Sequence, residues 1–366
     1  MLEMNVERIT DKNMKKKIQK KEVILCLVLA GILVIGGFFI SVSLAEKKDS
    51  AAPKEVAEEP EVVLHKSPLT GIEREKKYPA RPLVVSIDNV GDAVPQSWLS
   101  KADLVYEFPV EGQQSRLNAI YYSQFPEEFG PIRSTRPYFV DLTREYKGIF
   151  LAHGWSPEAM NYLMSGVVPY INAMNSSLHF YRVDDKTSPH DSYIKWSEVK
   201  RGIKEEGWWD TKKKIRSFKF LKEGQTSKGV DAIGITVNYG ASQCEYVYDA
   251  EKNVYLRCVN GEPFIDKETG KQIAVSNVLV QCVNSYVYDY KGRLSIDMCE
   301  GGEARIFTGG KTYKGTWSRE DLDSRTIFVN KDGKEFRLTP GKSWVQVANQ
   351  NTSVTYEKPE AEESAE

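Results

Sequence analysis

A run of 23 residues without a charged side chain, residues 23–45, constrains this 366-residue chain more than any other feature of its sequence. About 20 consecutive apolar residues let a helix cross a bilayer, and a helix satisfies its own backbone hydrogen bonds there. Residues 1–22 carry seven basic side chains, and such cationic segments remain in the cytoplasm. We therefore predict a single-pass signal-anchor in the cell membrane, with residues 1–22 cytoplasmic and the remainder extracellular.

Signal-peptide cleavage and lipid attachment are the two alternatives to an uncleaved anchor in this segment. Residues 43–45, Ser-Leu-Ala, would suit a signal peptidase, so cleavage after Ala45 stays open, although the apolar run is longer than a usual signal core. Lipid attachment is not expected. The only cysteine nearby is Cys26, at the start of the run, whereas a lipid-modified cysteine should follow the apolar run and a small residue.

Composition restricts the class of the exported part. Fifty basic residues face 51 acidic ones, so bulk charge does not favour nucleic acid as a partner. Residues 46–66 are polar and contain proline, which is typical of a flexible stalk, and residues 350–366 predict a disordered acidic tail. The region between them is long enough for two domains.

The two halves of this region have different patterns, which predict an α+β ectodomain of two domains. Residues 67–225 predict a mixed α/β domain that carries the site, with strands near 83–87, 103–108, 117–124 and 148–152 and helices near 137–147, 156–164 and 192–206. Residues 226–349 alternate strand patterns with turn sequences and show no helical period. We expect an antiparallel all-β domain there.

Four cysteines lie beyond the apolar run, at spacings that match no zinc site. Each pair flanks a predicted hairpin turn, and cysteines directly opposite each other on two strands lie within disulfide reach. We predict two disulfides, Cys244–Cys258 and Cys282–Cys299, which an exported domain permits. Four reduced, buried thiols are the alternative, and the sequence leaves it open.

The segment GPIRSTRP, residues 130–137, is the most informative for function. It places Arg133 and Arg136 at the start of a predicted helix, where positive charge is unfavourable, whereas an anion would be stabilised there by guanidinium and backbone N–H groups. Arg116 and Arg182 could join them in space. The alternative is that these arginines pair with Asp88, Glu107 or Glu111 and hold loops in place.

Two loop histidines, His153 and His190, are candidates for general acid or base chemistry, and satisfied structural histidines are the alternative. Ser156 reads as a helix cap rather than a nucleophile, because Pro157 and Glu158 follow it. The sequence contains no metal-ligand spacing, phosphate-binding glycine loop or dinucleotide fingerprint, so no cofactor or metal is predicted.

Several stretches together resemble the YerB-like family of bacterial lipoproteins: SPLTGIEREKKYPARPLVVSIDN, PQSWLSKADLVYEFPVEG, GPIRSTRPYFVDL, SPHDSYI, KTYKGTWSRE and LTPGKSWVQVAN. These are exported proteins of Gram-positive bacteria with two domains of unknown function. The resemblance covers about residues 67–349 and is strongest in the first half. It implies a surface location and no established activity.

The family pattern falls on ten residues of this chain: Asp88, Glu107, Glu111, Arg116, Arg133, Arg136, Asp141, Arg182, Pro189 and His190. The chain departs from the pattern in two respects. Family members commonly carry a lipid-attachment cysteine, and they commonly have Asn where this chain has Asp191. If that position contacts an anion, the extra carboxylate weakens binding here.

Three functions are compatible with these features. The leading hypothesis is noncatalytic binding of an anionic envelope component, a wall-peptide carboxylate or a teichoic-acid phosphate, with Trp155 and Tyr138 as apolar walls beside the arginines. The second is an envelope hydrolase, with His190 or His153 as base and Glu107 or Glu111 as acid. The third is a scaffold in which edge strands of the β domain recruit partner proteins.

Overall fold

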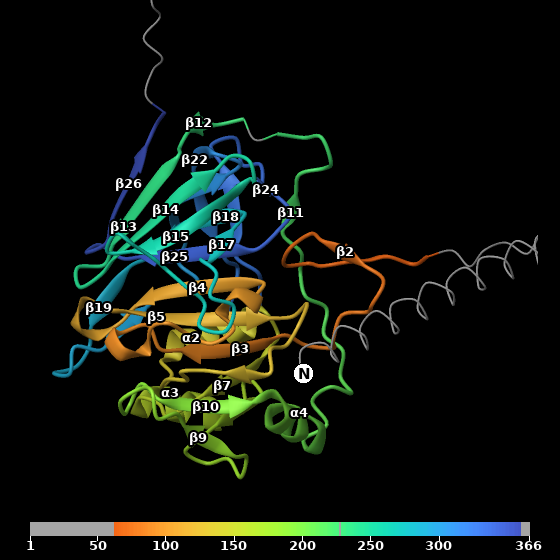
Figure 1. Cartoon of the computed structure of the whole chain (residues 1–366), viewed down its shortest axis with the longest axis vertical. Helices are drawn as coiled ribbons and strands as arrows, with labels where there is room; N and C mark the ends of the chain where they lie inside the picture. The colour runs from red at the N-terminus through yellow and green to blue at the C-terminus, as the bar shows by residue number, and fades with distance from the viewer. Residues whose placement is uncertain (1–61, 227, 360–366) are drawn as a thin grey trace, which may run out of the picture. The chain divides into compact units, whose positions relative to one another are not determined.

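A mixed sheet of eleven strands contains strands from both halves of the chain (Figure 1). The computed structural model describes residues 62–226 and 228–359, which belong to one compact unit. The sheet order is β12-β22-β21-β18-β25-β4-β5-β3-β7-β8, and β23 pairs with β22. The first half contributes β3 (Leu83–Ile87), β4 (Leu104–Pro109), β5 (Ser115–Tyr121), β7 (Ile149–Ala152) and β8 (Tyr170–Asn172). The second half contributes β12 (Val230–Asp231), β18 (Asn277–Cys282), β21 (Gly302–Thr308), β22 (Lys311–Ser318), β23 (Ile327–Asn330) and β25 (Ser343–Ala348).

A second sheet, of order β16-β15-β14-β13-β26 with β17 beside β15, belongs to the second half alone. Its strands are β13 (Gly234–Asn238), β14 (Gln243–Asp249), β15 (Val254–Val259), β16 (Glu262–Pro263), β17 (Ala274–Val275) and β26 (Ser353–Glu357). The small sheets are β6 (Glu128–Phe129) with β10 (Ser192–Lys195) and β9 (Phe180–Arg182), β1 (His65–Lys66) with β2 (Glu73–Arg74), β11 (Lys219–Phe220) with β24 (Arg337–Leu338), and β19 (Ser285–Val287) with β20 (Leu294–Ile296). The helices are α2 (Pro137–Glu145), α3 (Pro157–Met164) and α4 (Trp196–Glu205), with short 3-10 turns η1 (Gly91–Ala93), η2 (Leu99–Lys101) and η3 (Glu111–Gln113).

The central strands of the main sheet are covered on both faces. Every residue of β3, β4 and β25 is buried, as their nearly continuous apolar sequences require. Because alternate side chains of a strand point to opposite faces, Val85 packs in the core shared with the second sheet and α4. Val84 lies in the other core, which contains Phe139 of α2.

The predicted strands of the first half are confirmed, and so are two of its three helices. Pro137 occupies the first turn of α2, and the Ser156 Oγ accepts a hydrogen bond of 3.3 Å from the Ala159 N–H at the start of α3. The third predicted helix begins too early. Residues 192–195 form β10, because Tyr193 and Ile194 are fully buried between β9 and β6, and α4 begins only at Trp196.

The prediction of an antiparallel all-β second domain is only partly right. Most of its strands pair antiparallel, but β25 runs parallel to β18 and also parallel to β4 of the first half. A strand that is apolar on both faces is most stable inside a sheet rather than at its edge, and β25 reaches that position by joining the two halves. The exact boundary between residues 225 and 226 stays a prediction.

The predicted flexible ends are shorter than expected. Residues 353–357, assigned to the acidic tail, form β26 beside β13, because Val354 and Tyr356 pack against the core. The predicted stalk, residues 46–66, ends earlier, since His65 and Lys66 form β1. The predicted anchor, residues 23–45, lies outside the described residues. Among the residues that are described, no helix is long and apolar enough to cross a membrane.

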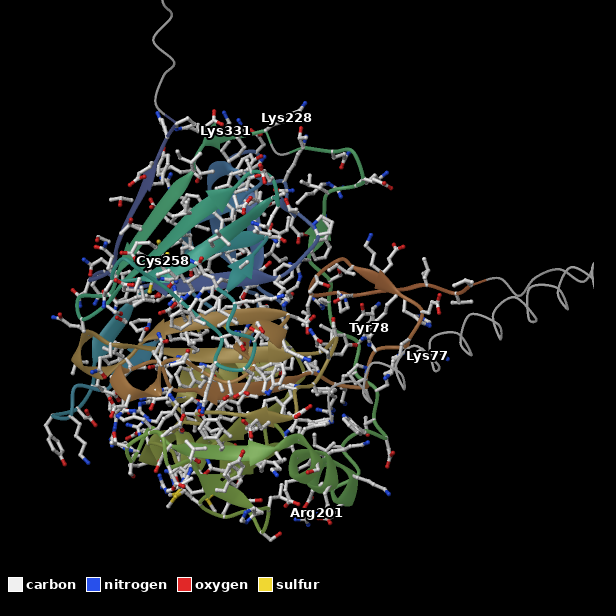
Figure 2. All side chains as sticks on the ribbon, in the orientation of Figure 1. Lys77, Tyr78, Arg201, Lys228, Cys258 and Lys331 are labelled. Carbon is white, nitrogen blue, oxygen red and sulfur yellow. The ribbon has the colours of Figure 1, made fainter. Side chains whose placement is uncertain are left out.

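The disulfide prediction is wrong, because the structure contains free thiols at all four cysteines. In the first hairpin Cys244 lies opposite Val259, so Cys258 is one residue out of register and points to the other face (Figure 2 labels Cys258). Cys282 pairs with Ala348 of β25 and not with Cys299. Burial raises the pKa of the Cys244 thiol to about 12, which keeps it protonated.

Candidate functional site

Several of the predicted site residues meet at one edge of the main sheet. Strands β3 and β7 are parallel, and β3 and β4 are both antiparallel to β5, so β3, β4 and β7 end at the same edge. Asp88 follows β3, Glu111 follows β4 and His153 follows β7, while Arg116 lies at the start of β5. Ligands of open α/β sheets commonly bind at this position, outside the carboxyl ends of the strands.

The segment of residues 130–136 is fixed across this edge by its backbone. The Arg133 N–H donates to the Ser86 carbonyl at 2.9 Å, and the Arg133 carbonyl accepts from the His153 N–H at 3.0 Å. The Thr135 N–H donates to the Gly154 carbonyl at 3.0 Å. These bonds hold the segment between the ends of β3 and β7, so the positions of Arg133 and Arg136 are set before any ligand binds.

Asp88 connects an arginine and a histidine. Its Oδ2 lies 3.2 Å from the Arg133 Nε and 2.8 Å from the His190 Nδ1. The Asp88 side chain is almost fully buried, whereas 27% of the Arg133 side chain is exposed. Among the described residues, the two terminal nitrogens of Arg133 have no hydrogen-bond partner in the protein, so this guanidinium can still bind a ligand in a bidentate manner.

Arg116 and Arg136 lie beside Arg133 and share contacts to Ser134. The Nη1 of Arg116 donates to the Ser134 carbonyl at 2.9 Å, and both Nη1 atoms approach the Ser134 hydroxyl, at 3.4 and 3.5 Å. Arg136 also pairs with Glu111, through Nε at 2.7 Å and Nη2 at 2.6 Å. We call the following group the arginine cluster: Arg116, Arg133, Arg136, Asp88, Glu111 and His190.

The arginine cluster has an excess of positive charge. Its three guanidinium groups face two carboxylates, and the buried Nε of Arg116 has no partner among the described residues. Burial lowers the pKa of Arg116 to about 10, and the charges of Arg136 and Arg133 act in the same direction against the opposing charge of Asp88. Such a cationic group, buried without full compensation, would be stabilised by an added anion.

His153 lies next to this cluster but in a different set of contacts. Its Nδ1 is 2.5 Å from the Ser192 hydroxyl. Burial lowers the pKa of His153, and the positive charge of Arg182 lowers it further, against the opposing effect of Asp191. Arg182 forms an ion pair with Asp191, so the Asp191 carboxylate neutralises this arginine.

Besides His153 and Arg182, two more predicted site residues lie outside the arginine cluster. Glu107 is fully buried and points to the opposite face of the sheet, where it pairs with Arg257 at 3.1 Å. The sequence could not indicate this, because the register that separates Glu107 from Arg116 depends on the pairing of β4 with β5. Asp141 lies on α2 and accepts a hydrogen bond of 2.7 Å from the Tyr162 hydroxyl of α3, and its burial raises its pKa.

The predicted apolar walls differ from expectation as well. Tyr138 is buried and its hydroxyl donates to the Pro109 carbonyl at 3.3 Å, so its ring belongs to the core. Trp155 is partly buried and its backbone pairs with Thr135. Sequence reasoning missed Ser134, whose hydroxyl contacts two arginines. Its position in the sequence between Arg133 and Arg136 could have indicated that Ser134 belongs to the site.

Comparisons with known proteins give a consistent result. Residues 69–209 match the N-terminal domain, and residues 235–345 the C-terminal domain, of "Protein of unknown function (DUF3048)". The chain is 37% identical over 290 residues to "Putative lipoprotein YerB" of Bacillus subtilis (strain 168), which covers 77% of this chain and 86% of that protein. The crystal structure of the YerB protein from Bacillus subtilis superposes with a TM-score of 0.72 at 34% identity, over 80% of this chain and 99% of that one.

Proposed function

The chain belongs to the YerB-like family with its two DUF3048 domains, and from this premise we propose that it binds an anionic cell-envelope component through the arginine cluster. We further propose that it acts outside the cytoplasm, held at the membrane by residues 23–45. The name of the relative supports a membrane-anchored exported protein, and the charge-free run at residues 23–45 supports a helical anchor.

One observation carries the binding proposal. Arg133 presents two terminal nitrogens without a protein partner in the described chain, on a partly exposed guanidinium held in place through its Nε by Asp88. A carboxylate or a phosphate would accept both N–H groups in the fork geometry that guanidinium favours. The excess positive charge behind Arg133 would favour the same ligand, because the partly buried setting screens charge less than water does.

The first test compares two arginine variants of the full-length protein. Arg133→Ala should weaken retention on purified cell-wall material by about 100-fold or more, as expected for the loss of two hydrogen bonds to a charged group at about 1.5 kcal/mol or more each. The matched control is Arg201→Ala on α4, labelled in Figure 2, because Arg201 is exposed and its ion-pair partners among the described residues are Glu198 and Glu205 of its own helix. Equal retention of both variants and the native protein would contradict the proposal.

The second test uses His153 as a reporter of a bound anion. Burial and the charge of Arg182 depress the pKa of His153, and Arg133 adds to this effect. A phosphate bound at Arg133 would offset the positive charges, so the pKa of His153 should rise towards its ordinary value. We expect an NMR titration of selectively labelled histidines to show this rise on addition of inorganic phosphate. A midpoint that phosphate leaves unchanged would count against a site next to His153, and exposed His179 provides the reference signal.

A hydrolase remains the second candidate, for a reason different from the one the sequence suggested. Glu107 cannot act as the acid, since it is enclosed in the core, and Glu111 is engaged by Arg136. The Asp88–His190 pair, however, is an arrangement in which a carboxylate orients an imidazole. Release of soluble fragments during the retention assay would favour this candidate over simple binding.

A further inference from the structure

A cavity of about 330 Å³ lies at the same sheet edge, on the face opposite the arginine cluster. Ser115 lines this cavity and donates to Glu107 at 2.7 Å, whereas its neighbour Arg116 points to the cluster. Asn89 lines the cavity too, directly after Asp88 of the cluster. The cavity and the arginine cluster therefore share the ends of β3 and β5, and of each pair of consecutive residues one belongs to the cavity and the other to the cluster.

Both halves of the chain form the walls of the cavity. The first half contributes the loop that contains η1 and the start of β5, and the second half contributes the turns after β13 and β15. The Ala241 N–H donates to the Gln113 carbonyl at 3.1 Å and joins the two sides at the rim. Neither half alone would enclose this space, so the cavity depends on both DUF3048 domains being present.

The lining exposes more apolar than polar surface, and it contains no positively charged side chain. The apolar part of the wall is formed by Val90, Val94, Val259, Pro263 and Phe264. The Gln114 amide, the Ser242 hydroxyl and the Glu262 carboxylate make no hydrogen bond to any described residue, and no Lys, Arg or His lines the cavity. The Asn260 Oδ1 accepts from the Gln243 N–H at 2.8 Å, which leaves its NH₂ group available.

We propose that this cavity binds a neutral sugar ring that carries hydroxyl and N-acetyl groups. Amide, hydroxyl and carboxylate groups match the donors and acceptors of such a ring, and the apolar wall matches its C–H face. The volume lies at the lower end of the roughly 300–1,000 Å³ of small-molecule sites, which suits one or two rings. This inference rests on the proposed function in one respect, the source of the ligand, which is the cell envelope. The side chains that line the cavity are different from those of the arginine cluster.

The experiment is calorimetric titration of the full-length protein, in a detergent without a sugar headgroup, with chitotriose as probe. Binding should be measurable in the native protein and several-fold weaker for maltotriose, which lacks the N-acetyl group. Gln114→Ala should weaken chitotriose binding by about 3- to 10-fold through the loss of one or two hydrogen bonds. Val94→Trp should abolish it, because Val94 is 39% exposed at the cavity and a larger side chain there fills the space without entering the core.

Arg201→Ala, remote on α4, should bind chitotriose like the native protein. Absence of chitotriose binding to the native protein would overturn the proposal, as would equal binding by the native protein, Gln114→Ala and Val94→Trp. A parallel titration with inorganic phosphate reports on the arginine cluster separately. If only phosphate fails to bind, the proposed anion site is contradicted and the proposed sugar site stands. If only chitotriose fails to bind, the sugar site is contradicted and the anion site stands.

Discussion

Glu107→Ala should lower the free energy of unfolding by about 3–5 kcal/mol, the cost of leaving one member of a buried ion pair without its partner. The Glu107 carboxylate pairs with Arg257 at 3.1 Å, and both side chains are fully buried. It also accepts hydrogen bonds from the Trp344 Nε1 at 3.0 Å and the Gln346 Nε2 at 2.9 Å. Removing the carboxylate would leave the buried guanidinium with only the neutral Tyr246 hydroxyl and Cys244 Sγ as acceptors among the described residues. The N–H groups of Trp344 and Gln346 that Glu107 accepts from would lose that acceptor. Urea unfolding followed by tryptophan fluorescence would measure the loss.

Two further variants make this prediction specific. Glu205→Ala removes an exposed partner of an ion pair on α4 and should change the free energy of unfolding by no more than about 0.5 kcal/mol. The double variant Glu107→Met with Arg257→Met should recover much of the lost stability, because a buried ion pair can often be replaced by apolar side chains of similar volume. A loss below about 1 kcal/mol for Glu107→Ala would show that water or a rearranged network compensates Arg257.

Gly130→Ala should destabilise the protein by about 1–3 kcal/mol through overpacking and should also weaken phosphate binding. A Cβ at position 130 would overlap the ring of Tyr193, which is fully buried on β10. Because interiors are closely packed, we expect the backbone of residue 130 to shift rather than the ring. Because residues 130–136 carry Arg133 and Arg136, that shift would displace the guanidinium groups from the ends of β3 and β7.

Thermal unfolding and phosphate titration of the same variant would test both effects, with the titration done well below the unfolding transition. Gly130→Ala combined with Tyr193→Val should regain part of the binding, since a smaller side chain opens the space for the new methyl group. An unchanged melting temperature together with native phosphate affinity would mean that the Tyr193 ring yields, and that close packing at Gly130 does not position the arginines.

Local patterns in the sequence predicted much of the first half. Strand β3 and helix α2 could be predicted because a short apolar run and a proline in a first turn act within a few residues. The conflict between arginines and a helix start is visible in the sequence, and it singled out Arg133 and Arg136. That Arg116 lies beside them, whereas Arg182 pairs with Asp191, depends on long-range strand pairing that no local pattern shows. The choice between a free arginine and one paired with Glu111 was open in the sequence for the same reason.

Long-range pairing explains the errors. A shift of one residue in the β14–β15 hairpin separates Cys244 from Cys258, and register depends on turn geometry that the sequence leaves undetermined. Glu107 was a candidate because the family pattern falls on it and because a hydrolase would need an acid. Its actual partner, Arg257, lies 150 positions away in the chain on β15, where no local pattern marks it.

The place of β25 has a consequence for incomplete chains. This strand is the last to be synthesised among those of the main sheet, yet it is inserted between β18 and β4 at the centre. A nascent or truncated polypeptide that stops before residue 343 would present two unpaired apolar strand edges, which are a template for aggregation and a target for proteases. Premature termination before residue 343 should therefore lead to degradation of the whole folded region rather than to a shortened but soluble product.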